Sequence, residues 1–461
     1  MSNLKLEEFK KNIKGKKVSV IGMGISNIPA IKYLIKLGAY VIGRDKKEEI
    51  PNELKGIENI EYVLGDKYLE GLEESDYILR SPGVKPFIPE IQKAVQMGVI
   101  LTSEMELFIH LTNATIIGIT GSDGKTTTTT LTSLFLKEAG RKVYVGGNIG
   151  TPLLDKVEQI GKDDYVVLEL SSFQLMTMDE KIDRAAITNI SPNHLDYHRS
   201  YEEYIFAKTN IFNGQDENGI LVLNQDNELT KEFAKKANGK VRMFSIEEKV
   251  DCGVYFENGE IISTVNGKKE KILDAKDVKL VGMHNIANIC TASSLVIDIT
   301  GKDAIKKVAM SFGGVEHRME LVREYNGVKW YNDSIASSPT RTIAGLKSFD
   351  QKIILIAGGY DKNIPYDVMG PYIMDKVKLL ILVGTTSNKI REAVEKEAKR
   401  RRKKVINIEE FKNLKDAVNY AKENSTCGDV VAMSPASASF DLYKNFEERG
   451  NYFKELVNSF K

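Results

Sequence analysis

The stretch Thr115–Leu131 constrains the fold of this chain more than any other, and it reads TIIGITGSDGKTTTTTL. Its β-branched, apolar residues up to Thr120 predict a buried strand, and Gly121-Ser122-Asp123-Gly124 predicts a tight turn. Lys125-Thr126-Thr127 then predicts a helix start, where free backbone amides favour an anion. Strand, glycine turn and helix in this order are typical of a phosphate-binding loop in an α/β domain.

The residues after the turn indicate what the loop would bind. Lys125 is expected to reach the terminal phosphates of a nucleotide, and the Thr126 hydroxyl is expected to hold a magnesium ion. Ile119 occupies the position of the first glycine in the usual phosphate loop, and Gly118 comes one place too early. We therefore expect a variant loop, unlike that of an ordinary kinase or GTPase. The alternative, a glycine turn without a ligand, is disfavoured because strand, glycines, Lys and Thr agree.

Length and charge limit the function classes. A chain of 461 residues is expected to form about three domains. Its net charge of +1 gives no general reason to bind nucleic acid or a membrane surface. The basic run Lys399–Lys404 follows a helical pattern, so cations at a helix C-terminus are favoured over a nucleic-acid patch. Three cysteines without metal-ligand spacing, no signal core and no long apolar run predict a cytoplasmic protein.

The first domain is expected over residues 1–106. A strand at Lys17–Ile21 leads to Gly22-Met23-Gly24, then to a helix at Pro29–Leu37 and a strand that ends near Asp45. This is the βαβ layout of a nucleotide site, but Asn27 replaces the third glycine of the dinucleotide pattern. A redox cofactor is therefore weakly indicated, whereas a simpler phosphate-bearing ligand, or only a tight turn, stays open. The turn Ser81-Pro82-Gly83 follows another short strand.

The second domain, expected over 107–313, places two further candidates near the phosphate loop. Glu169 ends the apolar run YVVLEL, which favours a magnesium role over a solvated surface carboxylate. Lys208 falls on the apolar face of a helix that starts at Ser200-Tyr201-Glu202-Glu203, a capping-box pattern. Such a lysine either snorkels or is chemically employed. With Glu169 and His194 nearby in the expected fold, we favour the chemical role, with the amine neutralised or converted into a metal-binding carbamate.

The third domain, expected over 314–461, follows a possible hinge at Phe312-Gly313-Gly314 and a charged group at Glu316-His317-Arg318. Each of its predicted strands ends in a small, polar loop, as in an open parallel sheet with a site at its carboxyl edge. Those strands are Val328–Tyr331, Lys352–Ala357, Leu379–Val383 and Asp429–Met433.

The combined motifs resemble one family, the Mur ligases, which build the peptide stem of bacterial cell-wall precursors. The resemblance runs from Gly22 to about Phe453, and its markers are GSDGKT, VLELSSFQL, NHLDYH with Lys208 downstream, HNIAN and EHRME. It implies an α/β fold of three domains: a Rossmann-like N-terminal domain, a central P-loop ATPase-type domain and a Rossmann-like C-terminal domain. The stretches GNIGTPLL and SPASASFDLYKNFEERG indicate the family type that adds D-glutamate to UDP-N-acetylmuramoyl-L-alanine.

The resemblance also implies roles, which we carry over residue by residue. It implies a monomeric, ATP-dependent ligase with two Mg2+ ions, whose partners are its small-molecule substrates. The catalytic group would be Lys125, Lys208, His194 and Glu169. ATP would be bound by Gly121, Ser122, Asp123, Gly124, Lys125, Thr126, Thr127, Asn285, Asn288, Arg318 and Asp333. The UDP precursor would be bound by Gly24, Ile25, Ser26, Asp45, Ser81, Pro82, Gly83, Asn148, Ser171 and His194. Lys362, Ser439 and Phe446 would receive the amino acid, and magnesium would be held by Thr126 and Glu169 and by His194 and carbamylated Lys208.

The chain departs from the family pattern at Ile335, where many members of this type carry a lysine that helps to hold the amino-acid carboxylates. Arg341 is a candidate to supply that charge. The Asp-Asn-Pro-Arg motif of members that add a diamino acid is not found in the third domain, which argues against that substrate.

Several other functions stay open. A sister ligase that adds another amino acid is one. A folylpolyglutamate synthetase is disfavoured, because such enzymes normally lack the first domain that is predicted here. A non-catalytic, nucleotide-dependent binding protein is disfavoured because Glu169, His194 and Lys208 are all present. A dehydrogenase is disfavoured, because only Gly22 and Gly24 match the dinucleotide pattern and its third glycine is missing.

Overall fold

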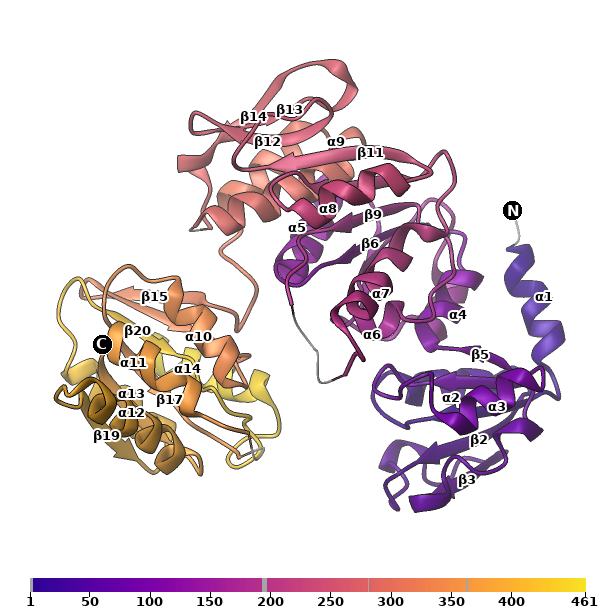
Figure 1. Cartoon of the computed structure of the whole chain (residues 1–461), viewed down its shortest axis with the longest axis horizontal. Coiled ribbons are helices and arrows are strands. Elements are labelled where there is room, and N and C mark those ends of the chain that lie inside the picture. The colour runs from indigo at the N-terminus through magenta and orange to yellow at the C-terminus, as the bar shows by residue number, and fades with distance from the viewer. Residues whose placement is uncertain (1–2, 193–196, 281, 362–363) are drawn as a thin grey trace. The chain divides into compact units, whose positions relative to one another are not determined.

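A computed structural model describes residues 3–192, 197–280, 282–361 and 364–461 of the chain (Figure 1). His194 and Lys362, both predicted site residues, lie outside these described ranges. The chain forms two compact units, residues 1–311 and 312–461, and each is described by itself.

The first sheet of unit 1 is fully parallel, with strand order β3-β2-β1-β4-β5. The predicted strand at Lys17–Ile21 is confirmed as β1, and the predicted helix begins two residues early, as α2 (Asn27–Lys36). Two strands were not predicted, because they are short, partly exposed and lack an apolar run: β3 (Ile60–Leu64) and β5 (Ile100–Thr102). The other elements are α1 (Leu4–Ile13), β2 (Tyr40–Asp45), β4 (Tyr77–Arg80) and α3 (Pro89–Gln96).

The second sheet of unit 1 has the strand order β14-β13-β12-β11-β10-β9-β6-β8-β7. It is parallel from β7 to β12 and ends in two antiparallel pairings. Asn258-Gly259, a favourable sequence for a tight turn, forms a two-residue hairpin between β12 and β13, with left-handed φ values of 49° and 82°. The strands are β6 (Thr115–Thr120), β7 (Val143–Gly147), β8 (Tyr165–Glu169), β9 (Arg184–Ile187), β10 (Ile220–Asn224), β11 (Lys240–Ser245), β12 (Gly253–Glu257), β13 (Glu260–Ser263) and β14 (Glu270–Asp274).

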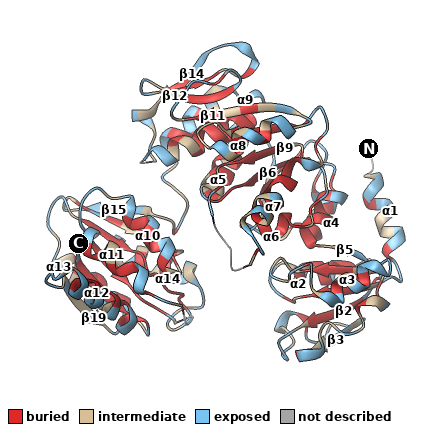
Figure 2. Ribbon diagram, in the orientation of Figure 1, coloured by how far each residue is buried: buried red, intermediate tan, exposed pale blue. Residues whose placement is uncertain are grey.

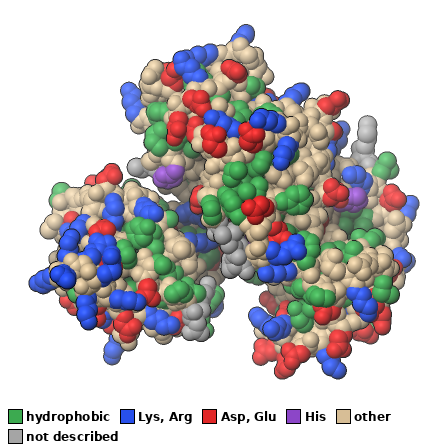
Figure 3. Space-filling model, viewed as in Figure 1, with side chains coloured by type: hydrophobic (Ala, Val, Ile, Leu, Met, Phe, Trp, Pro, Cys, Tyr) green, Lys and Arg blue, Asp and Glu red, His purple; other side chains and the backbone are tan. Residues whose placement is uncertain are grey.

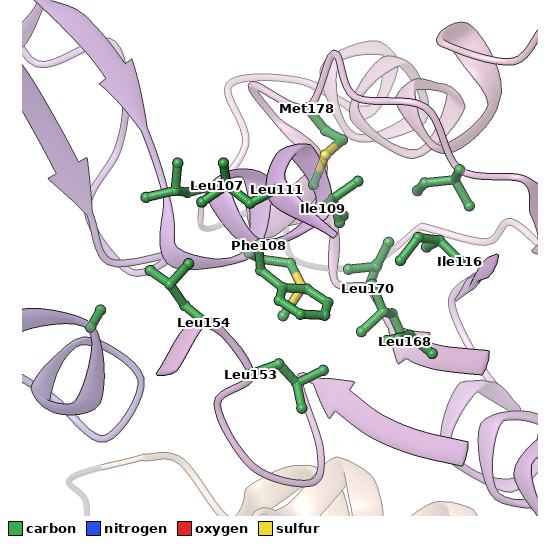
Figure 4. Close-up of a cluster of buried hydrophobic side chains, with 14 of the residues drawn as sticks. Leu107, Phe108, Ile109, Leu111, Ile116, Leu153, Leu154, Leu168, Leu170 and Met178 are labelled. Carbon is green, nitrogen blue, oxygen red and sulfur yellow. The ribbon is translucent and has the colours of Figure 1, made fainter. Parts of the chain in front are cut away.

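Helices cover this second sheet. The helix α5 (Lys125–Glu138) packs on α9 (Met283–Ser311), which is kinked at Gly301. The other helices are α4 (Glu104–Leu111), α6 (Ser172–Leu175), α7 (Tyr201–Asn213) and α8 (Glu228–Phe233). Figure 4 shows α4 inserting Phe108 among Leu153, Leu168 and Leu170, so one continuous hydrophobic core extends from the first sheet into the second. Burial of this kind stabilises the unit by about 25 cal/mol per Å² of apolar surface.

Unit 2 contains a six-stranded sheet of order β15-β16-β20-β17-β18-β19, parallel except for the β15–β16 hairpin. Its buried strands lie between helices (Figure 2), and Trp330 is buried against Phe453 and Phe460. The four predicted strands are confirmed as β16, β17, β18 and β20. The elements are β15 (Glu320–Tyr325), β16 (Val328–Asn332), α10 (Pro339–Lys347), β17 (Ile353–Ala357), α11 (Gly370–Lys376), β18 (Val377–Val383), α12 (Ser387–Arg401), β19 (Asn407–Phe411), α13 (Leu414–Glu423), β20 (Val430–Met433) and α14 (Phe446–Asn458).

The basic run has the predicted helix-terminal position. Arg400 and Arg401 lie in the last turn of α12 and pair with Glu397, and Arg401 also pairs with Asp375. Lys and Arg side chains gather over this part of unit 2 with acidic side chains among them (Figure 3). Among the described residues, no helix combines the length and the apolar character that crossing a membrane requires. The predicted α/β fold class is confirmed.

Candidate active site

The phosphate loop joins β6 to α5, and the backbone at its first and last residues, Gly121 and Gly124, leaves no room for a side chain. Gly121 has a φ of +147°, and a Cβ atom there would lie 1.8 Å from Thr188 Oγ1. Gly124 has a φ of +79°, and a Cβ atom there would lie 2.4 Å from Asn288 Oδ1. The turn therefore depends on glycine at these two positions.

The segment after β9 clamps the loop. Asn189 accepts a hydrogen bond from Ser122 N at its carbonyl (2.9 Å) and from Asp123 N at its side-chain oxygen (3.0 Å). Thr188 Oγ1 donates to the Asp123 carbonyl over 2.6 Å. Sequence reasoning did not single out Thr188 or Asn189. Their position at the carboxyl end of a strand beside the loop was the available signal.

Two lysines converge on one carbonyl group of the loop. Lys125 Nζ donates to Gly121 O and Ser122 O, both at 2.9 Å. Lys208 Nζ, from α7, donates to the same Gly121 O at 2.8 Å and to Thr120 Oγ1 at 3.2 Å. Lys208 is only 2% exposed, so the snorkelling alternative is wrong. Burial and the nearby Lys125 cation lower the pKa of Lys208 well below its ordinary value, which favours the neutral amine.

Glu169 ends β8 beside this loop and is 1% exposed, which excludes the solvated alternative. Its Oε1 atom accepts a hydrogen bond of 2.8 Å from Asn148 Nδ2, and Asn148 N donates to the Glu169 carbonyl. Its Oε2 atom is buried and has no hydrogen-bond partner among the described residues. A buried carboxylate oxygen of this kind fits a hard cation, and the Thr126 hydroxyl lies in the first turn of α5.

Within the described ranges, no three His, Cys, Asp or Glu side chains form a metal-binding group. The predicted magnesium ligands are of mixed type: a hydroxyl, a carboxylate, a modified lysine and His194, and the last lies outside the described residues. Their joint arrangement therefore stays a prediction.

The start of α9 borders the loop on another side. Thr128 Oγ1 donates to Asn288 Oδ1 over 3.3 Å, and Asn288 Nδ2 donates to Asn285 Oδ1 over 3.2 Å. Both predicted asparagines therefore lie beside the helix that the phosphate loop opens.

The predicted precursor residues of the first sheet gather at its carboxyl edge. A Cβ atom on Gly22 would lie 2.8 Å from Ser81 Cβ, so the turns after β1 and β4 are in contact. Asp45 Oδ2 accepts a hydrogen bond of 2.9 Å from Met23 N, in the turn that includes Gly24, Ile25 and Ser26. Asn27, in place of the third glycine, donates from Nδ2 to Gly22 O over 2.8 Å. It therefore closes the turn through its side chain.

Ser171 follows β8, and Phe173, two residues further on, accepts a hydrogen bond of 3.2 Å from Arg80 Nη2 at the end of β4. Ser171 caps α6 in a reciprocal capping box with Gln174. The predicted capping box at α7 is only half correct: Ser200 Oγ accepts from Glu203 N, but the Glu203 carboxylate accepts from Arg199 N. His198, which sequence reasoning did not single out, lies 2.9 Å from Ser172 Oγ through Nε2.

In unit 2, Asp333 follows β16 and is buried. It accepts hydrogen bonds from Ser434 Oγ (2.6 Å) and Met319 N (3.2 Å). Burial raises its pKa to about 6, although the Arg318 and Arg341 charges lower it. The Arg341 guanidinium donates to the backbone carbonyl of Ile335 over 3.2 Å, so its positive charge lies beside the backbone of Ile335.

Ser439 belongs to a loop that is ordered by a buried arginine, which sequence reasoning missed. Arg449 donates to the carbonyls of Ser334, Ser437 and Ala438, which orders the loop that includes Ser439. Burial lowers the pKa of Arg449 to about 10. Phe446, the first residue of α14, packs edge-on against His317, with ring centroids 6.1 Å apart.

Comparison with known proteins gives the same assignment along the whole chain. Residues 16–103 match the Mur ligase MurD-like N-terminal domain, residues 119–296 match the Mur ligase middle domain, and residues 317–437 match the Mur ligase glutamate ligase domain. UDP-N-acetylmuramoylalanine--D-glutamate ligase of Acetivibrio thermocellus is 52% identical over 463 residues, which cover 99% of each chain. The protein of the same name from Ruminiclostridium cellulolyticum is 50% identical over 100% of each chain.

Solved structures show the same fold at lower sequence identity. UDP-N-acetylmuramate-alanine ligase MurC from Thermotoga maritima matches with a TM-score of 0.57 at 18% identity, over 97% of this chain and all of that one. A pseudomurein peptide ligase type C from Methanothermus fervidus matches with a TM-score of 0.54 at 19% identity, with the same coverage. From the domain matches and the full-length relatives, we conclude that this chain belongs to the Mur ligase family.

Proposed function

We propose that this chain joins D-glutamate to UDP-N-acetylmuramoyl-L-alanine and converts ATP to ADP and phosphate. The observation that carries a ligase function is the convergence of Lys125, Lys208 and Glu169 around one phosphate loop. The names of relatives at 50–52% identity over nearly the whole chain supply the substrates.

In the proposed reaction, the terminal carboxylate of the precursor attacks the γ-phosphorus of ATP. The bond from the γ-phosphorus to the β,γ-bridging oxygen breaks, which gives an acyl phosphate and ADP. The amine of D-glutamate then attacks the acyl carbon, and a tetrahedral intermediate forms. The amine loses a proton and phosphate leaves, which completes the amide bond. Both reactants of the first step are anions, so their repulsion is the main obstacle that the site must overcome.

The chain supplies positive charge and fixed dipoles at this point. Lys125, at the mouth of the loop, would neutralise the γ-phosphate, and the first amides of α5 would bind phosphate oxygens. Asn148 holds one oxygen of Glu169, and the other oxygen is the one that would bind magnesium. Magnesium held by Thr126 and Glu169, with a second ion held by His194 and carbamylated Lys208, would screen the phosphate and carboxylate charges.

The remaining assignments follow from the same proposal. The turns after β1, β2 and β4 would hold the UDP end of the precursor, and Asn148 and Ser171 would contact its acyl part. Asn285, Asn288, Arg318 and Asp333 would position the nucleotide, and Lys362, Ser439 and Phe446 would receive the amino acid. We further propose that the protein acts as a monomer in the cytoplasm.

ADP release measured with UDP-N-acetylmuramoyl-L-alanine and a panel of amino acids tests the proposal. We expect release with D-glutamate and little with L-glutamate, L-alanine or a diamino acid. Release with another amino acid alone would indicate a sister ligase. Release that is independent of any amino acid, or no release with D-glutamate, would overturn the proposal.

A further inference from the structure

The two sheets of unit 1 are joined by polar contacts among three described segments, made by side chains to which the proposed function gives no role. These are Arg80 with the turn that follows it, the α6 segment, and Tyr197–Arg199. In the proposed function, the turn after β4 binds the nucleotide end of the precursor, and α6 follows Glu169 and Ser171. In the proposed function, the precursor must therefore span the region that these contacts hold together.

Arg80 makes the first connection. It is the last residue of β4, directly before Ser81, and its side chain is fully buried. Nη2 donates to Phe173 O (3.2 Å) and to Thr177 Oγ1 (3.0 Å), and Nη1 donates to Val84 O (3.2 Å). One guanidinium group thus binds both the nucleotide-side turn and the α6 segment. Because the N–H donors of a guanidinium group have a fixed planar arrangement, Arg80 sets the distance and the angle between the nucleotide-side turn and the α6 segment.

Tyr197 makes the second connection from the opposite direction. Its hydroxyl group donates to Pro82 O over 3.0 Å, and its ring lies 4.0 Å from the ring of Phe173, centroid to centroid. The neighbouring His198 contacts Ser172 Oγ, and Arg199 lies over the Phe87 ring at 4.5 Å. Three consecutive side chains therefore contact the segment between β4 and α3 and the start of α6.

From this arrangement we infer that Arg80 and Tyr197 are positioning residues. They hold the nucleotide-side turn at a fixed distance from Glu169 and the phosphate loop. This inference rests on the proposed function, since it takes a ligand that spans both regions. A positioning role and a purely structural role predict different effects on binding. If Arg80 and Tyr197 position the turn, a ligand that occupies only the turn binds equally well without their contacts, whereas the whole precursor binds less tightly.

Two ligands separate these roles. UDP occupies only the turn region, and UDP-N-acetylmuramoyl-L-alanine extends from it to the carboxylate site. For Tyr197→Phe we expect the dissociation constant of the precursor to rise about 3- to 10-fold, as for one lost hydrogen bond. The dissociation constant of UDP and the KM for ATP should stay within about twofold of wild type. Arg80→Lys should have the same selectivity and a larger effect.

Two matched controls test selectivity. Tyr62→Phe removes a hydroxyl group that donates to Leu54 O within the first sheet's domain, and Arg242→Lys changes a buried arginine that binds Ser294 O and Asp298. Both should leave the ratio of the two dissociation constants unchanged. The inference would be overturned if Tyr197→Phe weakened the binding of UDP and of the precursor equally, or if it weakened the binding of neither.

Both constants are measured by calorimetry without ATP. A wild-type protein that binds both ligands but forms no product would therefore overturn the proposed function, while the two constants still decide this inference. If Arg80→Lys fails to fold, Tyr197→Phe alone decides it. A wild type that binds UDP and not the precursor would overturn both.

Discussion

Lys125 and Lys208, 83 positions apart in the chain, donate hydrogen bonds to the same carbonyl oxygen, that of Gly121, over 2.9 and 2.8 Å. A carbonyl oxygen can accept both hydrogen bonds, but the two amines differ, because burial and the nearby Lys125 charge strongly lower the pKa of Lys208. In the proposed function, Lys125 neutralises a phosphate group, whereas Lys208 is the lysine that is carbamylated.

Replacing Lys125 tests the first of these roles. Lys125→Ala should lower ATP-dependent product formation by about 100- to 1,000-fold, because the γ-phosphate loses its neutralising cation. Lys137→Ala, an exposed lysine on the same helix, is the control and should retain activity. Turnover near that of wild type in Lys125→Ala, measured by ADP release, would refute the phosphate-loop assignment.

Replacing Lys208 tests the carbamate. Lys208→Ala should be inactive and should recover part of its activity when a short-chain carboxylic acid is added, since the acid can occupy the space and supply the missing oxyanion. The same acid should not restore Lys125→Ala, where a cation is missing. The assay is product formation against acid concentration, and full activity of Lys208→Ala without acid would show that no carbamate is needed.

Glu169 is tested through the metal requirement. Glu169→Gln keeps the size of the side chain and its acceptor for Asn148, but it removes the negative charge next to the proposed cation. We expect the Mg2+ concentration for half-maximal activity to rise about 10-fold or more. Glu138→Gln, at the surface end of α5, is the control. An unchanged Mg2+ dependence of Glu169→Gln would contradict the ligand role.

An ion cluster away from the site sets a pH-dependent stability. Asp298 on α9 accepts hydrogen bonds from Arg184 and Arg242 on two strands. Burial raises the pKa of Asp298, but the two arginines outweigh burial, and the net pKa lies well below the ordinary value of 3.8. A carboxyl group with a lowered folded-state pKa stabilises the fold above its unfolded-state pKa, and this stabilisation is lost as the pH falls through the folded-state pKa.

Asp298→Asn should therefore lower the free energy of unfolding by about 1–3 kcal/mol at pH 7. The difference from wild type should stay constant down to about pH 4–5 and shrink below that. Denaturant titrations followed by circular dichroism at several pH values measure it. A difference that grows as the pH falls would contradict the cluster's role.

The sequence predicted those parts of the molecule whose signal is local. The glycine turn, the acid at the end of β8 and the lysine on the inner face of α7 are each visible within a window of a few residues. Edge strands such as β3 and β19 carry no such signal, because one side of each is exposed and their apolar pattern is broken. Contacts made by Asn189, Arg80 and Arg449 join segments far apart in the chain, so only the folded arrangement could identify them.

Trp330, buried in unit 2 between Phe453 and Phe460, is the single tryptophan of the chain. Indole emission excited at the red edge of protein absorption therefore comes from one unit alone, whereas the 19 tyrosines report on the chain as a whole. The protein thus carries an intrinsic fluorophore by which the unfolding of residues 312–461 can be recorded separately, without any label.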